Sequence, residues 1–183
     1  MNKKVILNEN LIRITLERLC FELIEHHNDF SNSVLIGLQP RGAALAKRLQ
    51  QMLLDRGVKD VPLGLLDITF FRDDFRRRNN PLQPNQTHID FLVEDKRVIF
   101  IDDVLYTGRS VRAALDAIHS FGRPVDIELL VLIDRRFSRK LPIQPSYCGH
   151  QVDAIDSERI LVEWGDNQVN DQISIIPHES TQH

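Results

Sequence analysis

The sequence is poor in cysteine, in tryptophan and tyrosine, and in long apolar runs, and neither sign of charge is in large excess. Two cysteines, Cys20 and Cys148, cannot form the framework of several disulfides that holds small secreted domains together, and such scarcity suits a reducing compartment. The longest apolar stretches fall far short of the ~20 residues of a membrane helix. The apolar run near Met1 ends at Asn8, which is too short for a secretory leader. We therefore expect a cytoplasmic protein with no membrane partner.

The charge balance limits the classes of partner. Lys and Arg number 23 and Asp and Glu number 26, so the net charge is −3. This excludes a protein whose whole surface is basic for nucleic acid, while a local basic patch stays open. At roughly 150 residues per domain, residues 1–183 predict a single domain. A hydrophobic fraction of 42% indicates a folded chain with a proper core.

Strand-like and helical patterns alternate along the chain. Apolar residues recur at helical spacing from Leu11 to Ile24, with Asn8 or Asn10 as the N-cap. Further helices are expected from about Ala43 to Asp55 and from about Arg109 to Phe121, where Gly122 follows as a C-terminal cap. The strand-like runs are 33–38, 61–70, 97–101 and 125–133, with shorter pieces near 160–162 and 173–176. This order predicts an α/β fold with a central, mostly parallel sheet flanked by helices. The part from about residue 134 onward would form a small C-terminal hood within the same domain.

The stretch from Val98 to Ser110 has the most specific chemistry. A buried strand leads into Asp102 and Asp103, and a short loop then reaches a Thr-Gly-Arg-Ser turn where a helix begins. Ionised carboxylates accept hydrogen bonds from vicinal ribose hydroxyls. Backbone N–H groups at a Gly-containing turn and a helix N-terminus, with hydroxyls beside them, bind phosphate. A lone Asp-Asp would more often simply end a strand, but the whole combination favours a site for a phosphorylated sugar.

This stretch resembles the phosphoribosyl-pyrophosphate (PRPP) signature of type I phosphoribosyltransferases. Together with 66–74, 121–124 and 141–143, it is similar to the family of pyrimidine operon attenuation proteins, PyrR, over nearly the whole chain. The resemblance implies the type I phosphoribosyltransferase fold. It also implies a uracil phosphoribosyltransferase, a glycosyltransferase of pyrimidine salvage that makes UMP and pyrophosphate from uracil and PRPP. Some members of the family also bind messenger RNA of the pyrimidine operon and regulate its transcription.

Site residues follow from the resemblance by position. It implies a pyrophosphate loop at Pro40, Arg41 and Gly42, with a cis peptide bond on one side of Pro40. Without the family, these residues would suit a plain turn. Arg72 would lie in a loop of about 70–89 that closes over the pyrophosphate, although a solvated charged loop is the alternative. The implied catalytic residues are Asp102, Asp103 and Arg72. The remaining implied PRPP- and UMP-binding residues are Asp102, Asp103, Val104, Leu105, Tyr106, Thr107, Gly108, Arg109 and Ser110, with Arg135 and Ile160 at the base pocket.

The implied cofactor is Mg²⁺, bridging the pyrophosphate and the ribose hydroxyls. It would be held mainly by substrate oxygens and water, with Asp102 and Asp103 reaching the metal or its water. The resemblance also implies a homodimer or higher homo-oligomer. A phosphoribosyltransferase for a base other than uracil stays an alternative.

A UMP-sensing, RNA-binding regulator is the second hypothesis. Its candidate cations are Arg13, Arg18, Arg135, Arg136, Arg139 and Lys140. Two departures from attenuating members weigh against it. In the first helix, Glu17 and Phe21 stand where those members carry small polar or histidine residues. The segment 134–140 is also one residue longer than the corresponding segment of those members. Because a glutamate facing RNA repels phosphates, we favour the enzyme and expect no tight, UMP-dependent RNA binding.

Overall fold

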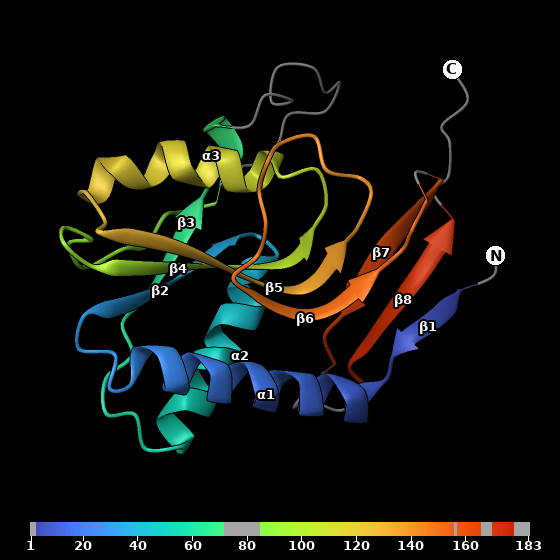
Figure 1. Ribbon diagram of the computed structural model, residues 1–183, viewed down its shortest axis with the longest axis horizontal. Helices are drawn as coiled ribbons and strands as arrows, with labels where there is room; N and C mark the ends of the chain where they lie inside the picture. The colour runs from blue at the N-terminus through green and yellow to red at the C-terminus, as the bar shows by residue number, and fades with distance from the viewer. Residues whose placement is uncertain (1–2, 72–84, 156, 166–169, 178–183) are drawn as a thin grey trace.

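A computed structural model describes residues 3–71, 85–155, 157–165 and 170–177 (Figure 1). Its helices are α1 (Glu9–His27), α2 (Gly42–Asp55) and α3 (Arg109–Ile118). Its strands are β1 (Lys4–Leu7), β2 (Ser33–Gln39), β3 (Leu63–Asp67), β4 (Arg97–Leu105), β5 (Asp126–Arg135), β6 (Tyr147–Val152), β7 (Glu158–Glu163) and β8 (Gln172–Pro177). In this part of the chain, no helix is both long and apolar enough to cross a membrane.

The central sheet has five parallel strands in the order β3-β2-β4-β5-β6. Helices α1 and α2 cover one face and α3 covers the other (Figure 1). Strands β2 and β4 are buried between these layers, which is why their sequences are almost continuously apolar. The predicted α/β fold with a parallel central sheet is confirmed. In such sheets ligands bind beyond the carboxyl ends of the strands.

A second, antiparallel sheet of order β1-β8-β7 forms the hood. Its apolar face joins the main core, because Ile160 and Ile173 belong to the same buried cluster as Ile12 and Ile133. The strand content differs from the expected hood of residues 134 onward. Strand β6 pairs with β5 in the central sheet, and β1 comes from the other end of the chain. The placement of β6 and of β1 follows from backbone pairing. The N–H and C=O groups on the outer edges of β5 and β8 need hydrogen-bond partners, and β6 and β1 supply them.

Two strands end where local patterns did not predict. Strand β3 stops at Asp67 and a 3₁₀ turn, Thr69–Phe71, replaces the end of the predicted strand 61–70. The Asp67 carboxylate makes this turn, accepting hydrogen bonds from the Thr69 backbone N–H (3.0 Å) and hydroxyl (2.6 Å). Strand β4 continues past residue 101 to Leu105, because that segment pairs in register with β5.

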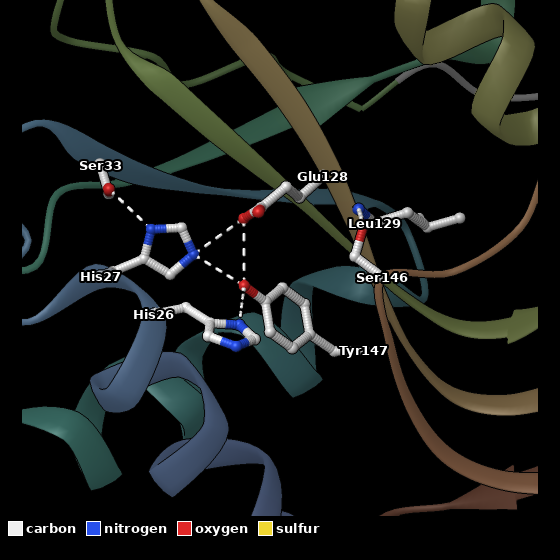
Figure 2. Close-up of polar contacts among 7 residues, drawn as sticks. All are labelled: His26, His27, Ser33, Glu128, Leu129, Ser146 and Tyr147. Carbon is white, nitrogen blue, oxygen red and sulfur yellow. Dashed lines mark hydrogen bonds and ion pairs between the residues drawn. The ribbon is translucent and has the colours of Figure 1, made fainter.

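The amino ends of the strands enclose a buried polar cluster, drawn in Figure 2. His27, at the end of α1, has a fully buried side chain. Its Nδ1 lies 2.8 Å from Ser33 Oγ, and its Nε2 lies 2.8 Å from Glu128 Oε2 and 3.0 Å from the Tyr147 hydroxyl. The Tyr147 hydroxyl also lies 3.0 Å from His26 Nδ1. The cluster therefore ties α1 to β2, β5 and β6.

Candidate active site

The carboxyl ends of the neighbouring strands β2 and β4 meet at one edge of the sheet, where Gly37 pairs with Ile101. The turn after β2 contains a cis Gln39–Pro40 bond, one of the two bonds predicted. Helix α2 then begins at Gly42, directly against β4. A Cβ at Gly42 would lie 2.1 Å from the Ile101 carbonyl oxygen, so only glycine allows this approach. The exposed Arg41 is thereby placed beside the end of β4.

Asp102 and Asp103 lie within β4 and influence each other. Asp103 is buried, Asp102 is half-buried, and Asp102 Oδ1 accepts a 2.9 Å hydrogen bond from the Asp103 N–H. Burial raises the pKa of Asp102 well above its usual value, and the negative charge of Asp103 raises it further. Burial also raises the pKa of Asp103, while the positive charge of Arg41 acts in the opposite direction on both groups. This pair is suited to accept hydroxyl donors or a cation, either of which favours the ionised form.

The turn after β4 presents the start of α3. Gly108 is the N-cap residue with φ +89°, a left-handed conformation that glycine adopts at little cost. Thr107 and Ser110 are partly exposed, and Thr107 Oγ1 accepts a hydrogen bond from the Arg109 N–H at 3.4 Å. The ten-residue helix α3 directs its free N–H groups and the positive end of its dipole to this turn. Such a turn can bind an anion. Leu105, buried in the core, can contribute only its backbone.

Arg135 lies beside this turn at the end of β5. Its guanidinium carbon is 4.0 Å from the centre of the Tyr106 ring, and its Nη2 donates a 3.1 Å hydrogen bond to the Ile155 carbonyl. The side chain is almost fully buried, and its Nε has no hydrogen-bond partner. Ile160, the other base-pocket residue of the prediction, is buried on β7 in the hood.

The predicted catalytic residue Arg72 falls outside the described residues. The chain on either side of that segment is fastened next to the site. Asp67 Oδ2 accepts a hydrogen bond from the Asn85 N–H at 2.9 Å, and Gln39 Nε2 donates to the Gln86 carbonyl at 2.7 Å. The described residues on both sides of 72–84 therefore lie beside the turn that follows β2.

One set of contacts was not predicted from the sequence. Arg139 and the Lys140 backbone, in the connection from β5 to β6, hydrogen-bond to carbonyl groups of the turn at Tyr106 and Thr107. Leu141 and Ile143 of the same connection lie against Gly108. The only signal in the sequence was the similarity of 141–143 to the family, which assigns no contact.

Comparisons with known proteins agree with this geometry. A family model described as phosphoribosyl transferase domain matches residues 3–165. The chain is 40% identical over 182 residues to the "Bifunctional protein PyrR" of Bacillus subtilis, covering 98% of this chain and 100% of the relative. It is 44% identical over 167 residues to the protein of the same name from Caldicellulosiruptor bescii, covering 90% and 91%. The chain belongs to the PyrR family of phosphoribosyltransferases.

Solved structures add the likeness of fold. The hypoxanthine phosphoribosyltransferase of Trypanosoma cruzi matches this PyrR-family chain with a TM-score of 0.71 at 16% identity, covering 96% of this chain and 97% of the other. A hypoxanthine phosphoribosyltransferase of Staphylococcus aureus matches with a TM-score of 0.63 at 21% identity, covering 83% and 80%. At such identities the likeness establishes the fold alone.

The donor set of this PyrR-family site suits Mg²⁺. In the described ranges, no group of three or more His, Cys, Asp or Glu side chains could hold a metal ion. Asp102 and Asp103 thus offer two carboxylates at most. Mg²⁺ prefers oxygen ligands and commonly takes most of them from substrate phosphates and water, so two carboxylates fit that ion.

Proposed function

We propose that the chain is a uracil phosphoribosyltransferase that makes UMP and pyrophosphate from uracil and PRPP with Mg²⁺. The observation that supports it is the meeting of Arg41, the Asp102–Asp103 pair and the turn at the start of α3 at one edge of the parallel sheet. A cation, paired hydroxyl acceptors and an anion site are the three groups that PRPP requires. Membership of the PyrR family supports the same activity.

In this proposal each element binds one part of the substrates. Arg41 and the backbone at Pro40 and Gly42 bind the pyrophosphate through charge-assisted hydrogen bonds. Asp102 and Asp103 accept hydrogen bonds from the ribose hydroxyls or hold the Mg²⁺ through its water. The PRPP phosphate lies on residues 106–110, with backbone from Val104 and Leu105 beside it. Arg135 and the hood residue Ile160 lie at the base.

The reaction requires positioning more than covalent help from the protein. The bond from ribose C1 to the pyrophosphate oxygen breaks, a uracil nitrogen bonds to C1 from the opposite face, and that nitrogen loses its proton. Mg²⁺, when bound, neutralises charge on the leaving pyrophosphate. Arg41 stabilises the same developing charge, and the carboxylates face the cationic sugar of the transition state. Arg72 and the loop of about 70–89 would close over the substrates and exclude water.

A parallel assay with several bases tests this function. Purified protein is incubated with PRPP and Mg²⁺ and with uracil, orotate, hypoxanthine or adenine, and the nucleotide and pyrophosphate formed are measured. We expect UMP and equimolar pyrophosphate with uracil alone. Transfer to hypoxanthine or adenine without transfer to uracil would contradict the proposed specificity for uracil. The absence of transfer to all four bases would contradict the activity.

A UMP-sensing, RNA-binding regulator is the second candidate function. It is favoured by the name of the relatives, "Bifunctional protein PyrR", and by the exposed arginines on α1. In the structure those arginines have carboxylate partners: Arg13 lies 3.1 Å from Glu17, and Arg18 lies 2.7 Å from Glu22. Cations already paired with carboxylates bind RNA phosphates less favourably. We therefore expect weak binding that depends on counterion release and fades as salt is raised.

An RNA titration separates the two expectations. The leader RNA of this organism's own pyrimidine genes is titrated at physiological salt, with and without UMP, beside a scrambled hairpin. We expect no difference between the two RNAs and no UMP effect. A Kd near ~10⁻⁸ M that UMP strengthens and the scrambled hairpin loses would make regulation an equal function.

The chain as a whole is proposed to act as one cytoplasmic domain that forms homodimers or larger homo-oligomers. One observation supports a single domain: the buried cluster is continuous from the central sheet into the hood. The free thiols of Cys20 and Cys148 suit a reducing compartment. Sedimentation equilibrium of the full chain measures the oligomer.

A further inference from the structure

The turn at the start of α3 is held from one side by the connection between β5 and β6. Arg139 Nη1 donates a 2.6 Å hydrogen bond to the Tyr106 carbonyl. The Lys140 backbone N–H donates a 3.0 Å hydrogen bond to the next carbonyl, that of Thr107. A Cβ at Gly108 would lie 3.2 Å from Ile143 Cδ1, so this connection also packs closely against the third residue of the turn.

These two hydrogen bonds determine where the N–H groups of the turn point. Gln39–Pro40 is the cis peptide bond of the described residues, so the peptides after Tyr106 and Thr107 are trans. In a planar trans peptide the C=O and the N–H point in opposite directions. Holding the carbonyls of Tyr106 and Thr107 toward Arg139 and Lys140 therefore turns the N–H groups of Thr107 and Gly108 to the other side. Those N–H groups are the donors that an anion at this turn would use.

Arg139 is itself fixed by a buried carboxylate. Its Nη2 donates to Asp134 Oδ1, and the Asp134 side chain is 7% exposed. Asp134 pairs in register with Leu105, the last residue of β4, so it is anchored in the sheet directly beside the turn. One guanidinium thus joins an anchored carboxylate to the carbonyl of Tyr106. Its planar fork of donors suits this double contact better than an ammonium does.

We propose that Arg139 is a positioning residue for the PRPP phosphate. It acts through the peptide group between Tyr106 and Thr107 and does not touch the substrate. The inference rests on the proposed function, in which this turn binds the phosphate of PRPP. It predicts that loss of Arg139 weakens binding of the phosphate and leaves binding of the base unchanged. Arg136 is the natural control, because it lies in the same connection but pairs with Asp153 on the exposed surface at 2.7 Å.

The test compares Arg139→Ala, Arg139→Lys and Arg136→Ala in the full chain. For Arg139→Ala we expect the KM for PRPP and the Kd for ribose 5-phosphate, measured by calorimetry, to rise about tenfold or more, as when a hydrogen bond to a charged group is lost. The KM for uracil should stay unchanged. Added guanidinium ion should restore part of the affinity of Arg139→Ala for ribose 5-phosphate, and Arg139→Lys should fall between Arg139→Ala and the wild type. Arg136→Ala should match the wild type in both measurements.

A second variant guards against misfolding. Removing Arg139 alone leaves Asp134 buried and unpaired, so the double variant Asp134→Asn/Arg139→Gln removes the charge of both partners. We expect it to melt within a few degrees of the wild type and still to bind ribose 5-phosphate about tenfold more weakly. Wild-type affinity for ribose 5-phosphate in the folded double variant would overturn the role of Arg139. An equal rise in the KM values for PRPP and uracil would also overturn it.

Failure of the inference and failure of the proposed function can be told apart. Ribose 5-phosphate binding needs no transfer reaction, so it reports on the turn even if the wild type uses none of the four bases. Wild-type binding of ribose 5-phosphate that Arg139→Ala weakens supports the inference whatever the base assay shows. No binding of ribose 5-phosphate by the wild type would contradict both.

Discussion

At the scale of single residues, the protonation of Asp102 and Asp103 should set the pH dependence of the proposed site. Burial raises the pKa of both carboxyls, and the charge of Asp103 adds to the effect on Asp102. Their ionised forms are therefore lost at a higher pH than those of ordinary carboxyl groups. Because the ionised forms accept hydroxyl hydrogen bonds and attract Mg²⁺, PRPP should bind more weakly as the pH falls. The positive charge of Arg41 lowers the pKa of both carboxyls and so counteracts this loss.

The first prediction is that Asp103→Asn removes most transfer activity and leaves the fold intact. The amide has nearly the shape of the carboxylate, but it carries no charge for the cationic sugar or for Mg²⁺. We expect kcat/KM to fall by an amount equivalent to ~2–4 kcal/mol of transition-state stabilisation. Steady-state kinetics with varied PRPP measures it.

The matched control for that variant is Asp116→Asn. Asp116 lies in α3 on the exposed surface, where its carboxylate is 3.9 Å from Arg112. Its substitution should leave kcat/KM at the wild-type value. Unchanged kinetics in Asp103→Asn as well would show that this carboxylate takes no part in the reaction.

At the scale of elements, the site depends on how closely the start of α2 approaches β4. The Cα of Gly42 lies where any side chain would meet the backbone of Ile101 and Asp102. The N-cap residue Arg41 is exposed, so its guanidinium is accessible to a substrate. The same approach places the pyrophosphate loop beside the carboxylates of β4. The packing of helix on strand therefore sets the geometry of the site.

The second prediction is that Gly42→Ala displaces the pyrophosphate loop. The new Cβ would lie 2.1 Å from the Ile101 oxygen, so helix α2 must shift away from β4. We expect the free energy of unfolding to fall by ~1–3 kcal/mol, as for other overpacked cores. The KM for PRPP should rise in the same variant. Urea unfolding and steady-state kinetics measure the two effects.

Gly57→Ala serves as the comparison for Gly42→Ala. Gly57 follows the other end of α2 with φ +91°, and a Cβ there would meet no atom within 4 Å. Its cost is conformational only, ~1–2 kcal/mol for an L-residue in the left-handed region. Its KM for PRPP should equal that of the wild type. Equal KM values for PRPP in the two variants would mean that the close approach of α2 to β4 does not determine the position of the pyrophosphate loop.

At the scale of the whole molecule, the candidate site lies at the carboxyl ends of the parallel strands. A buried polar cluster lies at their amino ends. The cluster in Figure 2 joins α1 to three strands around the buried His27. Burial lowers the pKa of His27, and this effect outweighs the opposite effect of Glu128. Arg97 and His26 lower it further. His27 is therefore neutral in the folded protein at neutral pH, hydrogen-bonded to Ser33, Glu128 and Tyr147.

The third prediction is that the protein loses stability in mild acid because the unfolded chain protonates His27 more readily than the folded protein does. Its pKa in the folded protein lies below the unfolded value of ~6.5, so the unfolded chain binds the proton more readily. The stabilisation is complete above pH ~6.5 and is lost as the pH falls below it, by at most ~1.4 kcal/mol per pH unit for this group. Urea unfolding between pH 8 and pH 5 measures the slope.

His27→Gln cannot take up that proton, so its unfolding free energy should depend less on pH than that of the wild type. His150→Gln is the control, because His150 is exposed on β6 and its loss should leave the wild-type slope. A wild-type slope in His27→Gln would contradict the assignment to His27. Figure 2 shows the contacts that the substitution removes.

Local signals determined the elements and the core of the site. Helix α1 follows from its apolar period and from the cap at Asn8, whose side chain accepts a hydrogen bond from Leu11 N–H at 3.0 Å. Strands β2 and β4 follow from apolar runs. Helix α3 ends at Ile118, before the predicted Phe121, and Gly122 caps the 3₁₀ turn His119–Phe121 that follows it. Asp102, Asp103 and the turn at Gly108 could be predicted because they are contiguous in sequence. Each of these features depends on residues a few positions apart, which is the range over which a sequence pattern is informative.

Contacts between distant residues decided the rest. The assignment of β1 to the hood and β6 to the central sheet depends on which strand edges are free, and the end of β3 depends on the Asp67 side chain. The contacts of Arg135 with Tyr106 and of Arg139 with Asp134 and the Tyr106 carbonyl likewise appear only in the folded chain. Hydrogen bonding of a buried donor or charge depends on its neighbours in space, and only the packing of strands and helices brings those neighbours together.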